Sequence, residues 1–337
     1  MTAEPDIVFE ARGYAGVVTL NRPRALNALT HGMCLALERQ LALWAADDAI
    51  ACVVITGAGE RAFCAGGDVR AIYDTARSDF EAALRFYADE YRLNSLIKHY
   101  PKPYVALWHG FVMGGGVGVS VHGSHRLCAE EVAFSMPETG IGFFPDVGAS
   151  YFLPRLPGET GAWLGLTGAR LGAGELCALG LAQACVPRER HTRLIDHLAA
   201  GTPVAEAIAR ERIAPPSDPL DARRAAIDRL FAGERPEDIL AALAQDTCIW
   251  AQDMRAKLAK KSPTSLAVTL RQIRTGAQLS FDQCMALELR LAGHFLRDRD
   301  FFEGVRAVII DKDHAPVWHP ARLEDVAPEA LESYFAD

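Results

Sequence analysis

The sequence predicts an α/β fold, because apolar segments of strand length alternate with segments of helical periodicity from residue 7 to about residue 157. The apolar runs at 52–56 and 104–108 have the length and composition of buried strands. Met33, Leu37, Leu41 and Trp44 recur at helical spacing before the first run, and a helix is expected over 80–98 before the second. Alternation of this kind is typical of a sheet whose strands are connected by helices.

The remaining elements of this region follow in order. Residues 7–10 and 17–20 flank Gly13 and Gly16, which predicts a β-hairpin at the start of the chain. A turn-rich segment is expected over 57–67. A glycine turn at 114–116 is expected to open a helix, and short strands are expected near Leu127 and Phe134.

The second part of the chain predicts helices with little strand character. They are expected over 164–182, 188–198, 199–244 (broken at Pro215-Pro216 and Pro236), 250–261, 265–275 and 281–298, with a polar tail from Val317. The proline cluster at 215–219 is the best candidate for a linker. We therefore divide the chain into a core with the active site at 1–200 and a helical region at 201–337.

Composition narrows the classes of function. The chain has 337 residues, of which 50% are hydrophobic and 23% charged, so it can bury a large core. Its net charge of −8 argues against nucleic-acid binding and favours a small-molecule partner. Residues 1–7 contain two acids and no basic stretch, which predicts a cytoplasmic protein. The uncharged run at 104–121 is long enough for a membrane span, but its histidine and five glycines argue against one.

Several motifs resemble known sites without matching them. The glycines at 57–62 follow a strand, but the next two glycines do not open a helix as a dinucleotide site requires. Ser120 narrowly misses a nucleophile elbow and is expected to be an ordinary helix residue. The eight cysteines are interpreted as reduced residues of the core. No histidine or cysteine spacing indicates a metal, so neither a metal ion nor a cofactor is expected.

Two glycine turns and two acids carry the functional signal. The turns are Ala65 to Asp68 and Gly114 to Gly116, and each is more often only a tight bend. Together they can direct two backbone N–H groups at one carbonyl oxygen, which would form an oxyanion hole. Glu138 and Asp146 follow and can transfer protons or attack a carbonyl. Read alone, Glu138 would most often be a solvated acid and Asp146 a helix N-cap.

Longer motifs resemble a known family. Residues 62–68 and 109–118 are similar to the crotonase (enoyl-CoA hydratase/isomerase) superfamily. Within it, the motifs Met136-Pro137-Glu138-Thr139 and Phe144-Pro145-Asp146-Val147-Gly148 resemble the 3-hydroxyisobutyryl-CoA hydrolase family, as do 90–94, 261–266 and 302–307. The similarity covers nearly the whole chain. It implies a crotonase-like spiral of ββα turns with a C-terminal helical region.

The resemblance also implies site residues. The N–H groups of Gly67 and Gly115 would form the oxyanion hole, with Ala65 and Asp68 in the neighbouring CoA-binding loop. Glu138 would be the nucleophile or the general base, a choice that the sequence leaves open. Asp146 would assist the leaving group and Glu90 would contact the acyl hydroxyl. The CoA adenine and phosphates would lie toward residues 22–26, and self-association is expected.

One departure from the superfamily bears on the reaction. Hydratases of this superfamily use two glutamates, and Gly118 stands at the first of these positions. Hydratase activity is therefore expected to be feeble or absent. The resemblance implies hydrolysis of 3-hydroxyisobutyryl-CoA, a step of valine catabolism. Two alternatives stay open: an enoyl-CoA isomerase or hydratase that uses the single Glu138, and a CoA-binding protein without activity.

Overall fold

The computed structural model describes residues 4–336, which form two packing units built from interleaved segments. Unit 1 comprises residues up to 68 together with 92–135 and 170–219, and unit 2 comprises 69–91, 136–169 and the residues from 220. Pro219, at the end of the expected linker, is the last residue of unit 1. The units do not coincide with a division at residue 200, because the chain passes between them several times. Each unit is described by itself below.

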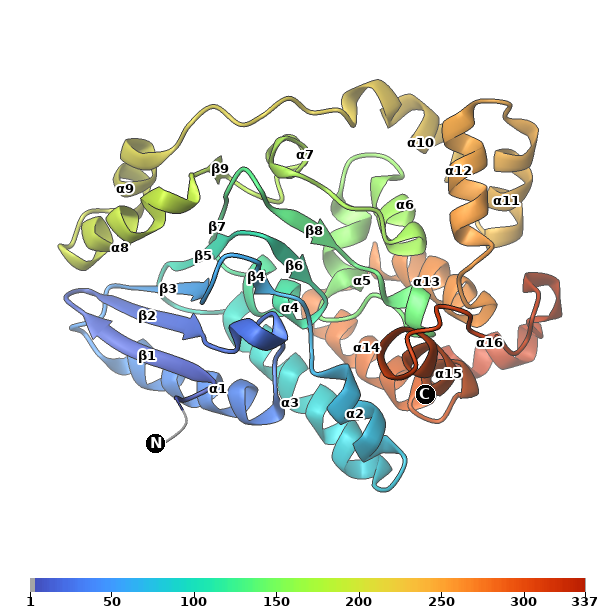
Figure 1. Ribbon diagram of the computed structural model, residues 1–337, viewed down its shortest axis with the longest axis horizontal. Helices are drawn as coiled ribbons and strands as arrows, with labels where there is room; N and C mark the ends of the chain where they lie inside the picture. Colours follow the sequence, from blue (N-terminus) through green and yellow to red (C-terminus); the bar gives the residue numbers. More distant parts are fainter. Residues whose placement is uncertain (1–3, 337) are drawn as a thin grey trace. The chain divides into compact units, whose positions relative to one another are not determined.

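Unit 1 contains both sheets. A six-stranded sheet has the order β1-β2-β3-β5-β7-β9, and a three-stranded sheet has the order β4-β6-β8 (Figure 1). The strands are β1 (Ile7–Arg12), β2 (Ala15–Leu20), β3 (Cys52–Gly57), β4 (Ala62–Cys64), β5 (Tyr104–Trp108), β6 (Phe111–Met113), β7 (His125–Cys128), β8 (Ala133–Ser135) and β9 (Ala184–Cys185). The expected hairpin and buried strands are confirmed.

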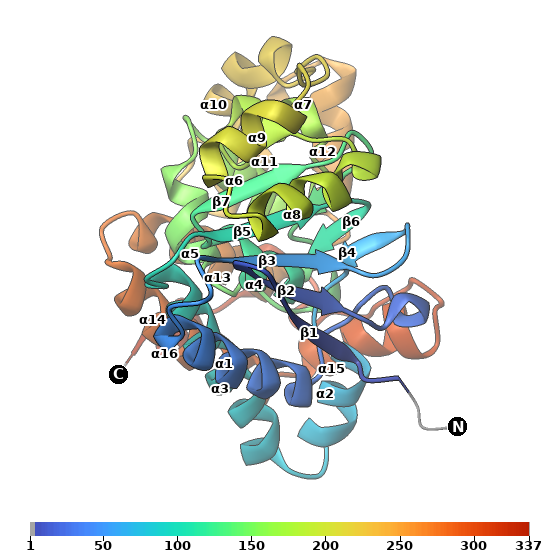
Figure 2. The ribbon, with the colours of Figure 1, turned by 90° about the vertical axis from the view of Figure 1, so that its left-hand side faces the viewer.

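Helices cover both faces of the large sheet. The helices that lie wholly in unit 1 are α1 (His31–Ala46), α4 (Gly115–Val121), α7 (Ala173–Ala178), α8 (His191–Ala199) and α9 (Val204–Glu211). Ala15 and Val17 of β2 pack in one apolar cluster with α8, whereas the backbone of Gly16 lies against the ring of Trp44 from α1. Because successive strand residues point to opposite faces, α1 and α8 cover opposite faces of the sheet (Figures 1 and 2). All strands after β1 pair in parallel, as in a sheet buried on both faces.

Unit 2 is helical. Its α-helices are α2 (Val69–Ala76), α5 (Ala149–Phe152), α6 (Thr160–Thr167), α10 (Arg224–Leu230), α11 (Pro236–Gln245), α12 (Ile249–Leu258), α13 (Pro263–Gly276), α14 (Phe281–Phe295), α15 (Arg299–Val305) and α16 (Pro328–Phe335). Helix α3 (Phe80–Lys98) belongs to unit 2 up to Tyr91 and to unit 1 from Arg92. No helix within 4–336 is long and apolar enough to cross a membrane.

Several expected boundaries were wrong for local reasons. The segment 57–67 contains strand β4, because Ala62 and Cys64 pair with β6 despite the surrounding turn residues. The expected helix at 164–182 is two short helices, since the first ends at Gly168 with its left-handed φ of +64°. Pro236 begins α11 rather than interrupting a helix. The expected polar tail from Val317 contains α16, which buries Tyr334.

The cysteines are thiols, and most of them are buried, as the sequence predicted. Two depart from this interpretation. Cys177 is half-buried, with its sulfur 3.9 Å from that of Cys128. Cys248 is exposed, and its sulfur accepts the N–H of Ala251 at 3.4 Å, which caps the start of α12. The role of Cys248 is therefore local and polar rather than core-filling.

Candidate active site

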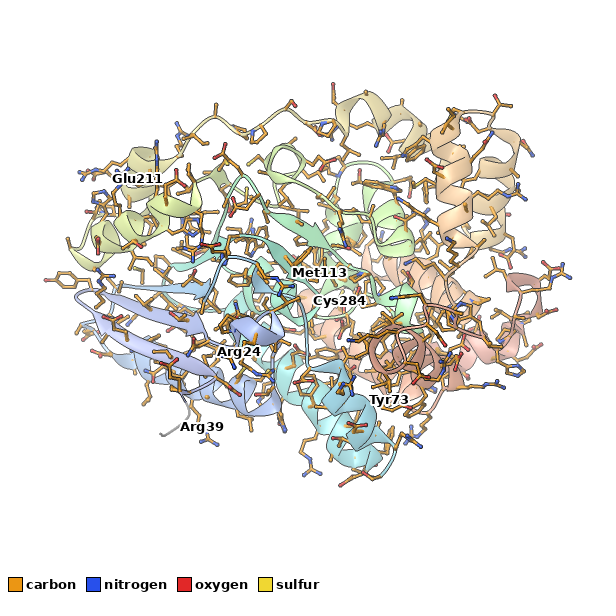
Figure 3. All side chains as sticks on the ribbon, in the orientation of Figure 1. Arg24, Arg39, Tyr73, Met113, Glu211 and Cys284 are labelled. Atoms are coloured by element: carbon orange, nitrogen blue, oxygen red, sulfur yellow. The ribbon has the colours of Figure 1, made fainter. Side chains whose placement is uncertain are left out.

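The three-stranded sheet brings the two glycine turns of unit 1 together. Cys64 pairs in parallel with Val112, so β4 and β6 end at the same edge of the sheet. The first glycine turn follows Cys64, and the second follows Met113, which is labelled in Figure 3. A Cβ atom at Gly116 would lie 2.4 Å from the carbonyl oxygen of Cys64. Only glycine permits this approach of the two turns.

The conformation of the first turn also requires glycine. Gly66 has φ of +118°, in the left-handed region that side chains rarely adopt. A Cβ atom there would lie 3.9 Å from the nitrogen of Gly115, so the turns face each other. Ser120, in the helix that follows the second turn, is confirmed as a structural residue. It accepts the indole N–H of Trp108 at 2.8 Å and donates to the Gly116 carbonyl at 2.6 Å.

The N–H groups predicted to form the oxyanion hole are available. Leu29 donates to the carbonyl of Gly66 at 2.9 Å and accepts the N–H of Asp68 at 2.8 Å. These bonds flank Gly67, whose own N–H donates to no acceptor within 4–336. The N–H of Gly115, the first residue of α4, is likewise without an acceptor in that range. Two unused donors on facing turns can bind one oxyanion.

The predicted CoA-binding loop has a defined scaffold. The N–H of Ala65 donates to the carbonyl of Leu26 at 3.0 Å. Arg22 donates to Asp68 at 3.1 Å and to the carbonyl of Ala28 at 2.7 Å. The guanidinium of Arg22 therefore braces this loop, whereas Arg24, labelled in Figure 3, is exposed.

In unit 2, Asp146 lies close enough to two other acids, Glu90 and Glu138, to interact with each electrostatically. Glu90 lies on α3, Glu138 begins a 3-10 turn (Glu138–Ile141), and Asp146 lies in the loop before α5. All three are buried, with 2%, 6% and 5% exposure. The interpretation of Glu138 as a solvated acid is wrong because Glu138 is buried, and that of Asp146 as an N-cap is wrong because the N-cap of α5 is Gly148.

Glu138 is a buried carboxyl with an unused oxygen. Its Oε2 has no hydrogen-bond partner within 4–336. Burial raises its pKa well above the usual range, and the charges of Asp146 and Glu288 raise it further, whereas the charge of Lys261 lowers it. Such a group holds or takes up a proton more readily than an exposed glutamate, as acid–base catalysis near neutral pH requires.

Asp146 is oriented by a tyrosine. Its Oδ2 accepts the hydroxyl of Tyr91 at 2.8 Å. Burial raises the pKa of Asp146 to about 7, although the bond from Tyr91 lowers it. Glu90 has an Oε1 without a partner in the described residues, and burial followed by the charge of Asp146 raises its pKa. These two acids resist simultaneous ionisation.

One tyrosine, Tyr87, interacts electrostatically with all three acids. Burial raises the pKa of Tyr87, and the charges of Asp146, Glu90 and Glu138 raise it further, so all three act on this one hydroxyl. Its ring stacks on Phe143 at a centroid distance of 5.3 Å. The acids therefore share a desolvated environment, which strengthens every electrostatic interaction between them.

Three residues near the acids, Tyr87, Lys261 and Glu288, gave no functional signal in the sequence when each was considered alone. Tyr87 lies one helical turn before Tyr91, and only its packing reveals its proximity to the acids. Lys261 acts electrostatically on Glu138 from a segment that the sequence singled out only by resemblance. Glu288 is fully buried on α14, in a helix that gave no functional signal. Their roles depend on contacts between distant segments, which local patterns do not encode.

Comparison with known proteins places this geometry in a family. The enoyl-CoA hydratase/isomerase family model matches residues 15–335. The 3-hydroxyisobutyryl-CoA hydrolase, mitochondrial, of Danio rerio is 43% identical over 344 residues, covering 99% of this chain and 90% of that protein. The protein of the same name from Homo sapiens is 42% identical over 347 residues, covering 99% and 89%.

Solved structures agree on the fold and carry different names. A carnitinyl-CoA dehydratase from Mycobacterium thermoresistibile has a TM-score of 0.95 at 41% identity, covering 99% of this chain and 97% of that chain. An enoyl-CoA hydratase from Rhodobacter sphaeroides 2.4.1 has a TM-score of 0.93 at 40% identity, covering 98% and 97%. The predicted crotonase-like architecture is confirmed.

Proposed function

This chain belongs to the enoyl-CoA hydratase/isomerase family, and from that premise we propose that it hydrolyses 3-hydroxyisobutyryl-CoA to 3-hydroxyisobutyrate and CoA. The observation that carries the proposal is Glu138, a buried acid with a raised pKa and a free oxygen. Relatives more than 40% identical over nearly the whole chain bear the name of this hydrolase. The reaction would serve the catabolism of valine.

The two glycine turns would bind the thioester carbonyl. As the carbonyl carbon becomes tetrahedral, its oxygen gains negative charge, which the N–H groups of Gly67 and Gly115 would stabilise. One such donor contributes about 3 kcal/mol to transition-state stabilisation in other enzymes. Ala65 and Asp68 would border the CoA moiety. Because the donors belong to the backbone, this binding does not depend on protonation.

Glu138 would supply the attacking group by one of two routes. In the first, its ionised carboxylate attacks the carbonyl carbon, the C–S bond breaks, and water then hydrolyses the anhydride. In the second, it removes a proton from a water molecule that attacks directly. In both routes the departing thiolate takes up a proton to give CoA. The raised pKa makes Glu138 a stronger base than an exposed glutamate.

Asp146 and Glu90 would have supporting roles. Asp146, held by Tyr91 and with a pKa of about 7, could protonate the leaving sulfur. Glu90 has a free oxygen that could accept the hydroxyl of the 3-hydroxyacyl group. Such a bond would favour hydroxylated acyl chains over plain ones, since the analogue without the hydroxyl would leave a buried acceptor unpaired.

The proposal requires the glycine turns and Glu138 to act on one thioester. Ser135 of β8 pairs in parallel with Met113, and Glu138 follows three residues later. The glycine turn at 114–116 and Glu138 thus follow paired residues of neighbouring strands.

Hydration of an enoyl-CoA is the second candidate, because two solved relatives are described as a dehydratase and a hydratase. Against it, Gly118 provides no carboxylate at the position of the first glutamate. An isomerase needs only one proton-shuttling acid and would retain Glu138. A CoA-binding protein without activity would bind acyl-CoA without turnover.

The deciding experiment compares two substrates. Purified protein is incubated with 3-hydroxyisobutyryl-CoA and released thiol is measured, and with crotonyl-CoA while loss of the enoyl absorbance is measured. We expect thiol release from the first and at least 100-fold slower turnover of the second. Glu138→Gln should lower thiol release by about 10³-fold. No thiol release, or an equally fast variant, would refute the hydrolase.

Other properties stay predictions. We propose that the enzyme needs no metal ion or cofactor beyond the CoA of its substrate, that it self-associates, and that it works in the cytoplasm. The names of the relatives place those proteins in mitochondria. The targeting prediction rests partly on residues 1–3, which lie outside the described residues. Activity after chelation, light scattering and cell fractionation test these points.

A further inference from the structure

The loop that carries Asp146 is held by a buried acid from the C-terminal helices. Glu288 of α14 is fully buried, and its carboxylate accepts the N–H of Gly148 at 2.7 Å and the N–H of Ser150 at 2.9 Å. It also accepts the hydroxyl of Ser150. Three donors from one short segment therefore converge on one carboxylate.

A second helix holds the other side of the same loop. Gln272 of α13 donates its side-chain N–H to the carbonyl of Pro145 at 2.6 Å, and both groups are buried. Asp146 thus lies between a backbone carbonyl bound by α13 and backbone N–H groups bound by α14. Neither bond involves the Asp146 side chain, which is left for Tyr91.

The backbone between these attachments is strained. Val147 has φ of +52° and is fully buried. A β-branched residue in this left-handed region is a true outlier, because its side chain crowds its own backbone. Such a conformation persists only when the surrounding contacts enforce it, and it recurs at functional sites. Here Glu288 and Gln272 hold the backbone on the two sides of Val147, and the N–H of Ala149 donates to the carbonyl of Asp146 at 3.0 Å.

We infer that Glu288 is a positioning residue for Asp146, acting through the backbone of residues 147–150. This inference rests on the proposed function, because it assigns Glu288 to the reaction through Asp146. Without the bonds from Glu288, Val147 can relax toward an ordinary conformation, and that rotation moves the neighbouring Asp146 away from Tyr91. A displacement of about 1 Å in a reacting group can cost about 100-fold in rate.

A purely structural role would have a different signature. If Glu288 only satisfied backbone donors, its substitution would lower the stability of the protein. The substitution would then slow an enzyme that lacks Asp146 as much as it slows the wild type. A residue that acts through Asp146 should lose its effect on turnover once Asp146 no longer functions.

The test uses kinetics of the full chain. Glu288→Gln keeps the shape of the side chain but presents an amide donor to the donors of residues 148 and 150. We expect kcat for 3-hydroxyisobutyryl-CoA to fall 10- to 100-fold with KM changed less than 3-fold. In the Asp146→Asn background the same substitution should change kcat less than 2-fold. The exposed Asp282→Asn on the same helix is the control and should leave kcat unchanged.

A crystal structure of Glu288→Gln gives a readout that is independent of activity. We expect the φ of Val147 to leave the left-handed region and the Tyr91–Asp146 hydrogen bond to break. Equal losses of kcat in the wild-type and Asp146→Asn backgrounds, or an unchanged loop in the crystal, would overturn the inference. If the wild type hydrolyses no acyl-CoA, the proposed function fails, and the crystal structure still decides whether Glu288 positions this loop.

Discussion

The two units differ in the chemical groups that they offer for catalysis. Unit 1 offers backbone N–H groups on two glycine turns, whose position depends on the close approach of Gly116 to Cys64. Unit 2 offers side-chain carboxyls, whose behaviour depends on burial and on one another. The first arrangement is fixed by sterics and indifferent to pH, whereas the second responds to pH and to single hydrogen bonds. Substitutions should therefore act on the two units in different ways.

Within unit 1, the largest effect is expected from Gly116→Ala. The added Cβ atom would lie 2.4 Å from the Cys64 carbonyl oxygen, so the two turns must separate. We expect a loss of about 10²- to 10³-fold in kcat, comparable to the loss of one oxyanion donor. Overpacking should also destabilise the fold by about 1–3 kcal/mol. Thiol-release kinetics and urea unfolding measure the two effects.

A matched control separates crowding from any general effect of alanine. Gly32 lies in α1 of the same unit, and a Cβ atom there would meet nothing closer than 3.9 Å. Gly32→Ala should leave kcat unchanged and should stabilise the helix by up to about 1 kcal/mol. Equal kinetic losses in both variants would show that the turns have no special role.

The next effect concerns the pH dependence of stability in unit 2. The folded pKa of Asp146 is raised from 3.8 to about 7, so the folded state holds a proton that the unfolded state releases. The stability that this group contributes is therefore fully present below pH 3.8 and is lost as the pH rises through 7. Asp146→Asn removes the charge, and the free energy of unfolding should rise by roughly 2 kcal/mol at pH 8.

Urea unfolding of the wild type and of Asp146→Asn at pH 8 and at pH 5 tests the direction of this pH dependence. The gain in the free energy of unfolding should be smaller at pH 5, because the wild-type aspartate keeps most of its proton in the folded state at that pH. A gain of the same size at both values would show that burial of charge at Asp146 does not limit stability. The neutral Asn can still accept the Tyr91 hydroxyl, so this bond need not be lost.

A smaller effect is expected from Tyr91→Phe. In the wild type, the hydroxyl of Tyr91 favours the ionised form of Asp146. Its removal should therefore raise the pKa of Asp146 further. We expect kcat to fall about 10-fold and the corresponding limb of the pH–rate profile to move to higher pH. Tyr100→Phe deletes a hydroxyl bonded to the carbonyl of Leu41 in unit 1 and should change neither. An unmoved profile in Tyr91→Phe would contradict the assignment of that limb to Asp146.

The smallest effect is expected in unit 1, from Arg22→Gln. Its ion pair with Asp68 is partly exposed, with side-chain exposures of 21% and 27%, so it contributes no more than about 1 kcal/mol. Loosening the CoA-binding loop should raise KM 2- to 5-fold and leave kcat within 2-fold. Arg12→Gln breaks an exposed pair with Asp196 and serves as the control. A change in kcat would assign this loop a part in the chemical step.

More of unit 1 than of unit 2 could be predicted from the sequence. The buried strands and both glycine turns of unit 1 could be predicted, because apolar runs of strand length and the glycines that follow them are local signals. In unit 2, Glu138 and Asp146 were candidates from their place after the glycine turns, but their roles came from resemblance, and Glu90 came from resemblance alone. Buried acids look like exposed ones in a sequence. Tyr91, Lys261 and Glu288 gain their roles from contacts with segments far along the chain. No local pattern shows that an acid on a C-terminal helix will hold a loop near residue 148.

The exposed thiol of Cys248 has a practical consequence for every assay described above. Reagents that report free CoA by disulfide exchange will also titrate an accessible protein thiol, giving a burst that could be taken for a first turnover. Cys248→Ser removes that background, and serine is a better N-cap than cysteine, so helix α12 should keep its start. Such a variant would make single-turnover measurements interpretable at high enzyme concentration.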